Sequence, residues 1–219
     1  MGKEIDLLEQ YPKAKRNVQE RGASKTEEDR AIARRFGKEF FDGERRHGYG
    51  GFGYHPRFWQ PVIPAFQKTY GLSPSSSVID VGCAKGFMLH DFRELIPGIQ
   101  VQGIDVSEYA VLNSKEEVRP FLSAADARSL PFPDHSFDLV ISINTVHNLE
   151  GEDLRQALRE IERVSRGKSF VTVDAFRTDE EKELMDAWNL TAKTILHVDE
   201  WKKLFDAVGY SGDYYWFIP

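Results

Sequence analysis

The sequence has a single cysteine, no long apolar run and no internal repeat, and each of these absences removes a class of protein. Its 219 residues contain one cysteine, Cys83, which rules out an internal disulfide and a zinc site built from clustered cysteines. No apolar run approaches the roughly 20 residues of a membrane-spanning helix. The first 15 residues lack the apolar core of a signal peptide. We therefore expect a cytoplasmic protein with no membrane partner and no metal site.

The charge of the chain is unevenly distributed. Residues 1–70 contain 14 Lys and Arg against 10 Asp and Glu, whereas residues 71–219 contain 15 against 25. An acidic main region argues against a nucleic-acid partner. The basic first segment is explained either by a solvated charged helix or by an anionic small-molecule partner. In the second case Arg45, Arg46 and Arg57 are the candidate anion-binding residues.

Strand and helix patterns alternate after the polar, proline-marked stretch at 73–77. The expected strands are 78–81, 101–106, a short one within 119–126, 137–144, 168–174 and 213–219, and the expected helices between and after them are 86–95, 107–117, 151–167 and 199–208. This order predicts an α/β fold with a doubly wound, Rossmann-like and mainly parallel sheet. Ligands of such sheets bind beyond the carboxyl ends of the strands. We divide the chain into an N-terminal helical and lid segment, 1–71, and a ligand-binding domain, 72–219.

The turn after the first strand reads DVGCAKG at 80–86. A dinucleotide fingerprint needs G-x-G-x-x-G, but here the series is Gly82, Ala84 and Gly86, and the last glycine comes one residue too soon. The chain also has no G-x-x-x-x-G-K-[ST] phosphate loop. In addition, the Asp80 carboxylate would repel a pyrophosphate placed against this turn.

A cationic ligand without phosphate suits this turn better, and S-adenosylmethionine is one, because it carries a sulfonium and an ammonium group. Small residues at 82, 84 and 86 let the backbone approach it closely. Asp105 ends the second strand, where a carboxylate can accept hydrogen bonds from two ribose hydroxyls. Asp126 follows the third strand and can accept one from the adenine amine. Each carboxylate alone could instead cap a turn, but three at successive strand ends favour the ligand.

These motifs resemble those of class I S-adenosylmethionine-dependent methyltransferases. The resemblance rests on DVGCAKG at 80–86, GIDVS at 103–107, AADARSLPFPDHSFDLVIS at 124–142 and AVGYSGDYY at 207–215. It covers residues 72–215, and over 78–142 it is similar to the ubiquinone and menaquinone carbon methyltransferases. It implies a strand order of 3-2-1-4-5 with further strands at one edge.

The resemblance also implies a set of cofactor contacts. Asp80 and Gly82 would hold the methionine end, and Asn144 would line the floor near the sulfonium. The residues expected to contact the cofactor are Tyr49, Asp80, Gly82, Ala84, Gly86, Asp105, Val106, Asp126, Ala127 and Asn144. The chain departs from the family in two ways. Ala84 replaces the usual middle glycine, and the ending has room for one closing strand, which leaves an edge for residues 189–198 or a second subunit of a homodimer to cover.

The front segment supplies candidates for closure and chemistry. Thr26 is expected to cap a helix that runs to about Phe41, with Ile32, Phe36 and Phe40 on one face. Residues 47–59 mix glycine with aromatic residues, which favours either a lid over the ligand or an anchor to the core.

Methyl transfer to a hydroxyl is helped by a base that removes its proton. His147 is the first candidate for base or substrate positioner, and Tyr54 and His55 are the second. A half-buried structural histidine is the alternative reading of His147. The expected function is methylation of a small molecule, on oxygen before nitrogen or carbon. A nicotinamide-dependent oxidoreductase and a catalytically silent cofactor-binding module are the alternatives.

Overall fold

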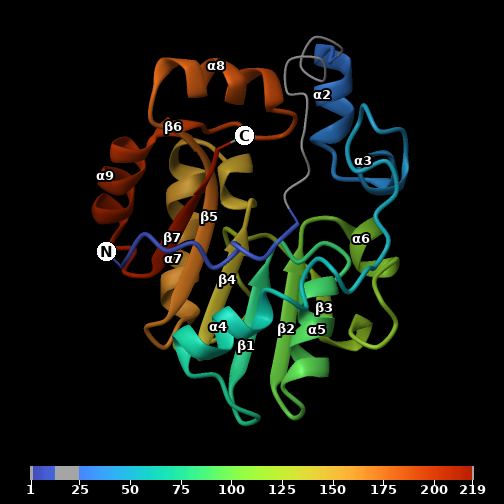
Figure 1. The fold of residues 1–219 in the computed structure, drawn as a ribbon, viewed down its shortest axis with the longest axis vertical. Coiled ribbons are helices and arrows are strands. Elements are labelled where there is room, and N and C mark those ends of the chain that lie inside the picture. The colour runs from blue at the N-terminus through green and yellow to red at the C-terminus, as the bar shows by residue number, and fades with distance from the viewer. Residues whose placement is uncertain (1, 13–24, 219) are drawn as a thin grey trace.

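The computed structural model describes residues 2–12 and 25–218, and within them seven strands form one parallel sheet (Figure 1). The order is β3-β2-β1-β4-β5-β6, with β7 also paired to β5. The strands are β1 (Ser77–Val81), β2 (Gln100–Asp105), β3 (Leu122–Ala124), β4 (Leu139–Ile143), β5 (Ser169–Phe176), β6 (Leu196–His197) and β7 (Asp213–Phe217). The predicted doubly wound fold and the order 3-2-1-4-5 are confirmed.

At the β5 edge of the sheet, one strand pairs with two short strands instead of one long neighbour. Residues 170–174 of β5 pair with β7, and residues 175–176 pair with the short β6. On its other side, β7 pairs in parallel with the start of the chain, because Tyr214 donates to the Lys3 carbonyl and accepts from the Ile5 amide, each at 3.0 Å. The edge expected to be free is therefore covered within the chain, partly by residues 196–197 and partly by residues 2–5.

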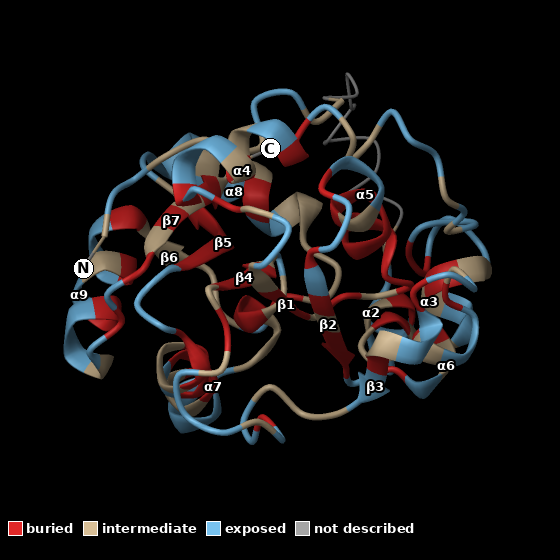
Figure 2. Ribbon diagram, turned by 90° about the horizontal axis from the view of Figure 1, so that it is seen from below, coloured by how far each residue is buried: buried red, intermediate tan, exposed pale blue. Residues whose placement is uncertain are grey.

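Helices cover both faces of the sheet. The helices are α2 (Glu27–Ala33), α3 (Lys38–Asp42), α4 (Ile63–Tyr70), α5 (Phe87–Leu95), α6 (Glu108–Leu112), α7 (Gly151–Val164), α8 (Asp179–Trp188) and α9 (Val198–Val208), with 3₁₀ turns η1 (Arg119–Phe121) and η2 (Val146–Asn148). Phe66 of α4 and Phe92 of α5 belong to one buried cluster, and Leu158 of α7 and Phe205 of α9 to another. Figure 2 shows the strands as the buried layer between them. No helix among the described residues is long and apolar enough to cross a membrane.

Three local expectations were wrong. The helix expected from Thr26 to Phe41 is divided into α2 and α3, because Phe36 adopts a φ of +49° and Gly37 caps α3. The helix expected over 107–117 ends at Leu112, although Ser107 caps it as predicted, accepting from the Ala110 amide at 3.1 Å. The helix expected over 199–208 begins one residue earlier, at Val198, because His197 caps it.

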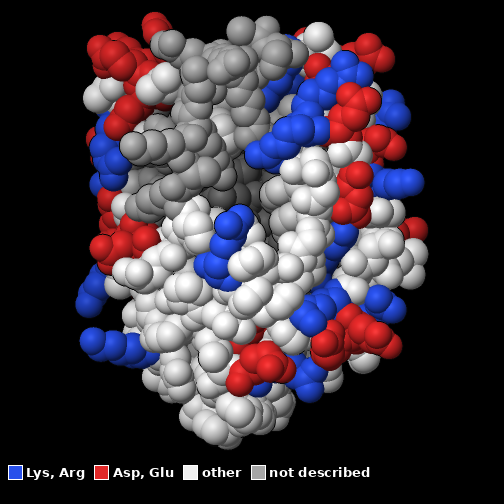
Figure 3. All heavy atoms as spheres, turned by 45° about the vertical axis from the view of Figure 1, so that its right-hand side comes forward, with Lys and Arg blue, Asp and Glu red and all other residues white. Residues whose placement is uncertain are grey.

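Helices α2, α3 and α6 lie beyond the carboxyl ends of β1 to β3, and α8 lies beyond those of β5 and β6 (Figure 1). This is the end of the sheet where the topology reverses, since β1 lies between β2 and β4. On the face seen in Figure 3, the acidic and basic side chains of the described residues lie mostly along the two sides of the view, with both signs on each side.

Candidate functional site

A cavity of about 950 Å³ lies at this end of the sheet. Ten of the predicted cofactor-binding and catalytic residues line it: Tyr49, Asp80, Gly82, Ala84, Asp105, Val106, Asp126, Ala127, Asn144 and His147. The predicted anion-binding residue Arg45 lines it as well. Gly86, Tyr54 and His55 do not. The volume is at the upper end of the range of small-molecule sites, so the cavity has room for more than one ligand.

Two buried carboxylates lie at the floor of the cavity, at the ends of β1 and β2. Asp105 accepts the backbone amides of Ala84 and Ser107, each at 2.8 Å. No described residue donates a hydrogen bond to the Asp80 carboxylate, and Asp80 is only 6% exposed. Burial, together with the nearby Asp105, raises the pKa of Asp80 to about 7. A cationic ligand would supply the missing counter-charge.

The glycine turn brings the backbone close to this pair. Gly82 has a φ of +90°, and a Cβ there would lie 2.1 Å from Thr145 Oγ1. Ala84, which replaces the family's glycine, still adopts a left-handed φ of +50°. Glycine is required at position 86 for a different reason: a Cβ there would lie 2.8 Å from the side chain of Leu122 and 2.9 Å from that of Val118. Gly86 therefore allows packing against β3 and does not line the cavity.

The predicted role of Asp126 meets an obstacle. Its two oxygens take four hydrogen bonds from Arg128, from the backbone amide, from Nη2 and from Nε to each oxygen, at 2.6–3.0 Å. These contacts use the acceptor capacity of a carboxylate and lower the pKa of Asp126. An adenine amine could bind this carboxylate only if Arg128 released it. Arg128 itself also pairs with Asp153 at 2.7 Å.

The segment around α3 is fastened over the cavity by Asp42. This carboxylate accepts from Lys85 Nζ at 2.6 Å, from the Tyr109 hydroxyl at 2.8 Å and from the Phe52 amide at 2.9 Å. Lys85 belongs to the glycine turn and Tyr109 to α6, so Asp42 joins the front segment to both. Beside it, Tyr49 packs on Phe52 with ring centroids 4.2 Å apart. The lid and anchor interpretations of this segment therefore both have contacts in their favour.

Tyr54 and His55 lie away from the cavity, contrary to the expectation that they act on a substrate. The Tyr54 hydroxyl donates to Asp91 at 2.6 Å, and burial with this hydrogen bond raises the pKa of Tyr54 to about 12. His55 is exposed, and its ring packs against Phe58. Neither residue is placed to take a proton from a molecule in the cavity.

His147 and Asp174 form a buried pair on the β4 and β5 side of the cavity. Nδ1 of His147 accepts the Asp174 backbone amide at 2.8 Å, so the proton of the neutral ring lies on Nε2. Burial lowers the pKa of His147 despite the nearby carboxylate. In this arrangement the His147 ring offers an N–H donor at Nε2, and its Nδ1 is already occupied by the Asp174 amide.

Asp174 is a candidate residue that the sequence did not single out. It is the last residue of β5 that pairs with β7, and it is buried and lines the cavity. Its carboxylate accepts no hydrogen bond from a described donor, although the unprotonated Nδ1 of His147 lies 3.4 Å from Oδ1, and burial raises the pKa of Asp174. Its position at a strand end was the available signal, but no motif marked it.

Comparison with known proteins agrees with this geometry. A family profile described as a methyltransferase domain matches residues 79–173. A malonyl-[acyl-carrier protein] O-methyltransferase of Legionella pneumophila is 29% identical over 134 residues, covering 59% of this chain and 46% of the relative. A sterol 24-C-methyltransferase of Gibberella zeae is 36% identical over 103 residues, covering 41% of this chain and 26% of the relative. The chain thus spans less than half the length of either curated relative.

The profile match over residues 79–173 and these relatives support a class I S-adenosylmethionine-dependent methyltransferase. The fold agrees, since a methyltransferase structure from Archaeoglobus fulgidus superposes with a TM-score of 0.52 at 21% identity over 70% of each chain. The cofactor of such methyltransferases is S-adenosylmethionine. The buried Asp80 carboxylate, which accepts no hydrogen bond from a described residue, the close Gly82 turn and the size of the cavity fit this cofactor. No cluster of three metal-ligating side chains occurs in residues 2–12 or 25–218.

Proposed function

We propose that this chain transfers the methyl group of S-adenosylmethionine to a hydroxyl oxygen of a small molecule. The observation that carries the proposal is the pair of buried carboxylates, Asp80 and Asp105, with no cationic side chain of residues 2–12 or 25–218 beside Asp80. When bound, the cofactor supplies an electrophilic methyl group on a sulfonium sulfur. The two carboxylates would bind its cationic and ribose parts and fix its orientation.

The acceptor would occupy the other part of the cavity, beyond β4 and β5. Asp174 would take the proton that the acceptor hydroxyl loses when its oxygen receives the methyl group and the cofactor leaves as its neutral thioether. A carboxyl group whose pKa is raised by burial is suited to receive this proton. His147 would donate from Nε2 to hold the acceptor. The similarity to an O-methyltransferase supports oxygen, and the similarity to a C-methyltransferase keeps carbon among the outcomes to test.

A labelled-methyl assay tests the proposal. The protein is incubated with S-adenosylmethionine labelled in its methyl group and with panels of hydroxyl, amine and activated-carbon acceptors, and the labelled product is identified. We expect label on a hydroxyl oxygen. Label on carbon or nitrogen would contradict the choice of oxygen. Cofactor binding without transfer to any panel would indicate a catalytically silent module.

The role of Asp174 is tested in the same assay. Asp174→Asn should lower kcat by about 10²–10⁴, the usual contribution of a general base, and leave the Kd of S-adenosylhomocysteine unchanged. Asp206→Asn, the same change at an exposed position on α9, should leave both values unchanged. An undiminished kcat in Asp174→Asn would remove the base from the mechanism.

A further inference from the structure

Arg34 differs from the other basic residues that line the cavity. The cavity is lined by five basic residues in the described part of the chain: Arg34, Arg45, Arg128, Arg177 and Lys193. Four of them bind groups of the protein: Arg45 the carbonyls of Gly48 and Tyr49, Arg128 the carboxylates of Asp126 and Asp153, Arg177 that of Glu4, and Lys193 that of Glu150. Arg34 has no side-chain partner among the described residues, and its Nε is buried without a hydrogen bond.

An unpaired guanidinium nitrogen in a buried position is costly. Leaving a buried donor without a hydrogen bond is unfavourable, and more so when the group is charged. Arg34 is also held in place, since it caps the C-terminus of α2 with its backbone amide bonded to the Arg30 carbonyl at 2.9 Å. The Arg34 side chain therefore starts from a fixed backbone position at the cavity, and no residue in the described part of the chain pairs with its charge.

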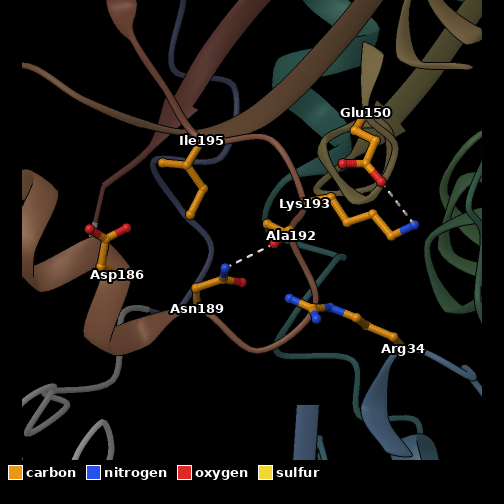
Figure 4. A pocket seen from close by; sticks show the side chains of 7 residues that line it. All are labelled: Arg34, Glu150, Asp186, Asn189, Ala192, Lys193 and Ile195. Carbon is orange, nitrogen blue, oxygen red and sulfur yellow. Dashed lines mark hydrogen bonds and ion pairs between the residues drawn. The ribbon is translucent and has the colours of Figure 1, made fainter. Parts of the chain in front are cut away.

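A second cavity of about 500 Å³ adjoins the first at this position. Arg34, Asn189 and Lys193 line both. Figure 4 shows the Arg34 guanidinium pointing toward Asn189 and the loop after α8, with no interaction drawn between them. Oδ1 of Asn189 is also buried without a partner. Neither acidic residue of this second cavity pairs with Arg34. Glu150 pairs with Lys193 at 3.5 Å, and Asp186 is exposed on the opposite wall.

We infer that the methyl acceptor carries an anionic group, a carboxylate or a phosphate, that binds the Arg34 guanidinium where the two cavities meet. A guanidinium binds either group through two parallel hydrogen bonds, and Asn189 offers an acceptor for a neighbouring hydroxyl. This inference rests on the proposed methyl transfer, for which it names the class of acceptor. Of the three residues expected from the sequence, Arg45 lines the cavity and donates to the Gly48 and Tyr49 carbonyls. Arg46 pairs with Glu44 at 3.1 Å and Arg57 is exposed, and neither of these lines the cavity.

Calorimetric titration of the protein saturated with S-adenosylhomocysteine tests the inference. The probes are two hydroxyl compounds with an anionic group, salicylate and glycerol 3-phosphate, and their neutral counterparts, salicylamide and glycerol. We expect one anionic probe to bind at least about tenfold more tightly than its neutral counterpart, as a charge-assisted pair in a partly buried site requires. The probe that binds distinguishes a carboxylate from a phosphate.

Variants identify the residue responsible. Arg34→Gln should reduce the preference for the anion to less than about twofold, and Arg34→Lys should leave it intermediate, because lysine keeps the charge but not the paired hydrogen bonds. Arg35→Gln, at the exposed neighbouring position, should behave as the unmodified protein.

Three outcomes would overturn the inference: equal binding of charged and neutral probes, no binding of either anion, or an unchanged preference in Arg34→Gln. Binding of S-adenosylhomocysteine by the same samples keeps this result separate from the proposed function. A protein that binds this product but no anion overturns only the inference about the acceptor. A protein that does not bind the product overturns the proposed function.

Discussion

Asp80→Asn should abolish most of the pH dependence of cofactor binding. Burial and Asp105 hold the pKa of Asp80 at about 7 in the free protein, so about 9% of the carboxyl is ionised at about pH 6 and about 76% at about pH 7.5. If the cation binds the ionised form, the association constant for S-adenosylmethionine rises about eightfold over this interval, or about 1.2 kcal/mol. Asp80→Asn loses this rise.

Calorimetry at the two pH values measures the effect. The ammonium group of the ligand titrates around pH 8, and the comparison with Asp80→Asn removes this shared contribution. Asp126→Asn provides the matched control, because the pKa of Asp126 is lowered by Arg128 and its carboxylate stays ionised throughout. The reasoning is refuted if the unmodified protein and Asp80→Asn have the same pH dependence, or if affinity falls as the pH rises.

The same variant makes an independent prediction for the free protein. A raised native pKa means that the native state binds more protons than the unfolded chain between about pH 4 and pH 7, so this group lowers stability as the pH rises. Asp80→Asn should therefore raise the Tm of the ligand-free protein more at about pH 8 than at about pH 5. An equal gain at both pH values would show that ionisation of Asp80 has no part in it.

Two further variants test the turn and the front segment. Gly82→Ala should lower the free energy of unfolding more than Gly167→Ala does. Gly167 has a similar φ of +99° but open space around a new Cβ, so its change costs only the backbone strain of about 1–2 kcal/mol. Equal losses in denaturant titrations would exclude the clash with Thr145. Asp42→Asn should speed release of S-adenosylhomocysteine in stopped-flow measurements, because it weakens the Lys85 contact. Glu39→Gln, at an exposed position on α3, should not change the release rate, and equal rates for both variants would remove the role of Asp42 in closure.

The central part of the site was predictable because it depends on short-range sequence order. A parallel sheet brings the ends of successive strands together, so Asp80, Asp105 and His147 were expected on one cavity and line it. The Asp126 carboxylate was expected to be available to a ligand. Its occupation by Arg128 depends on a side-chain conformation that the D-A-R spacing permits but does not require.

Other features depend on contacts between distant parts of the chain. The pairing of residues 2–5 with β7 joins positions about 210 residues apart, and no local pattern announces it. The break at Phe36 needs a left-handed backbone that an aromatic residue rarely adopts. Arg34 gains its significance only when α2 is placed opposite Asn189, so its lack of a partner could not be read from the basic composition of the front segment.

A crystal structure with S-adenosylhomocysteine bound tests the central claim most directly. We predict that the ammonium group of the ligand lies against Asp80 and its ribose hydroxyls against Asp105, with the sulfur directed toward the part of the cavity lined by His147 and Asp174. A ligand bound elsewhere, or one with its adenine against Asp80, would contradict the account.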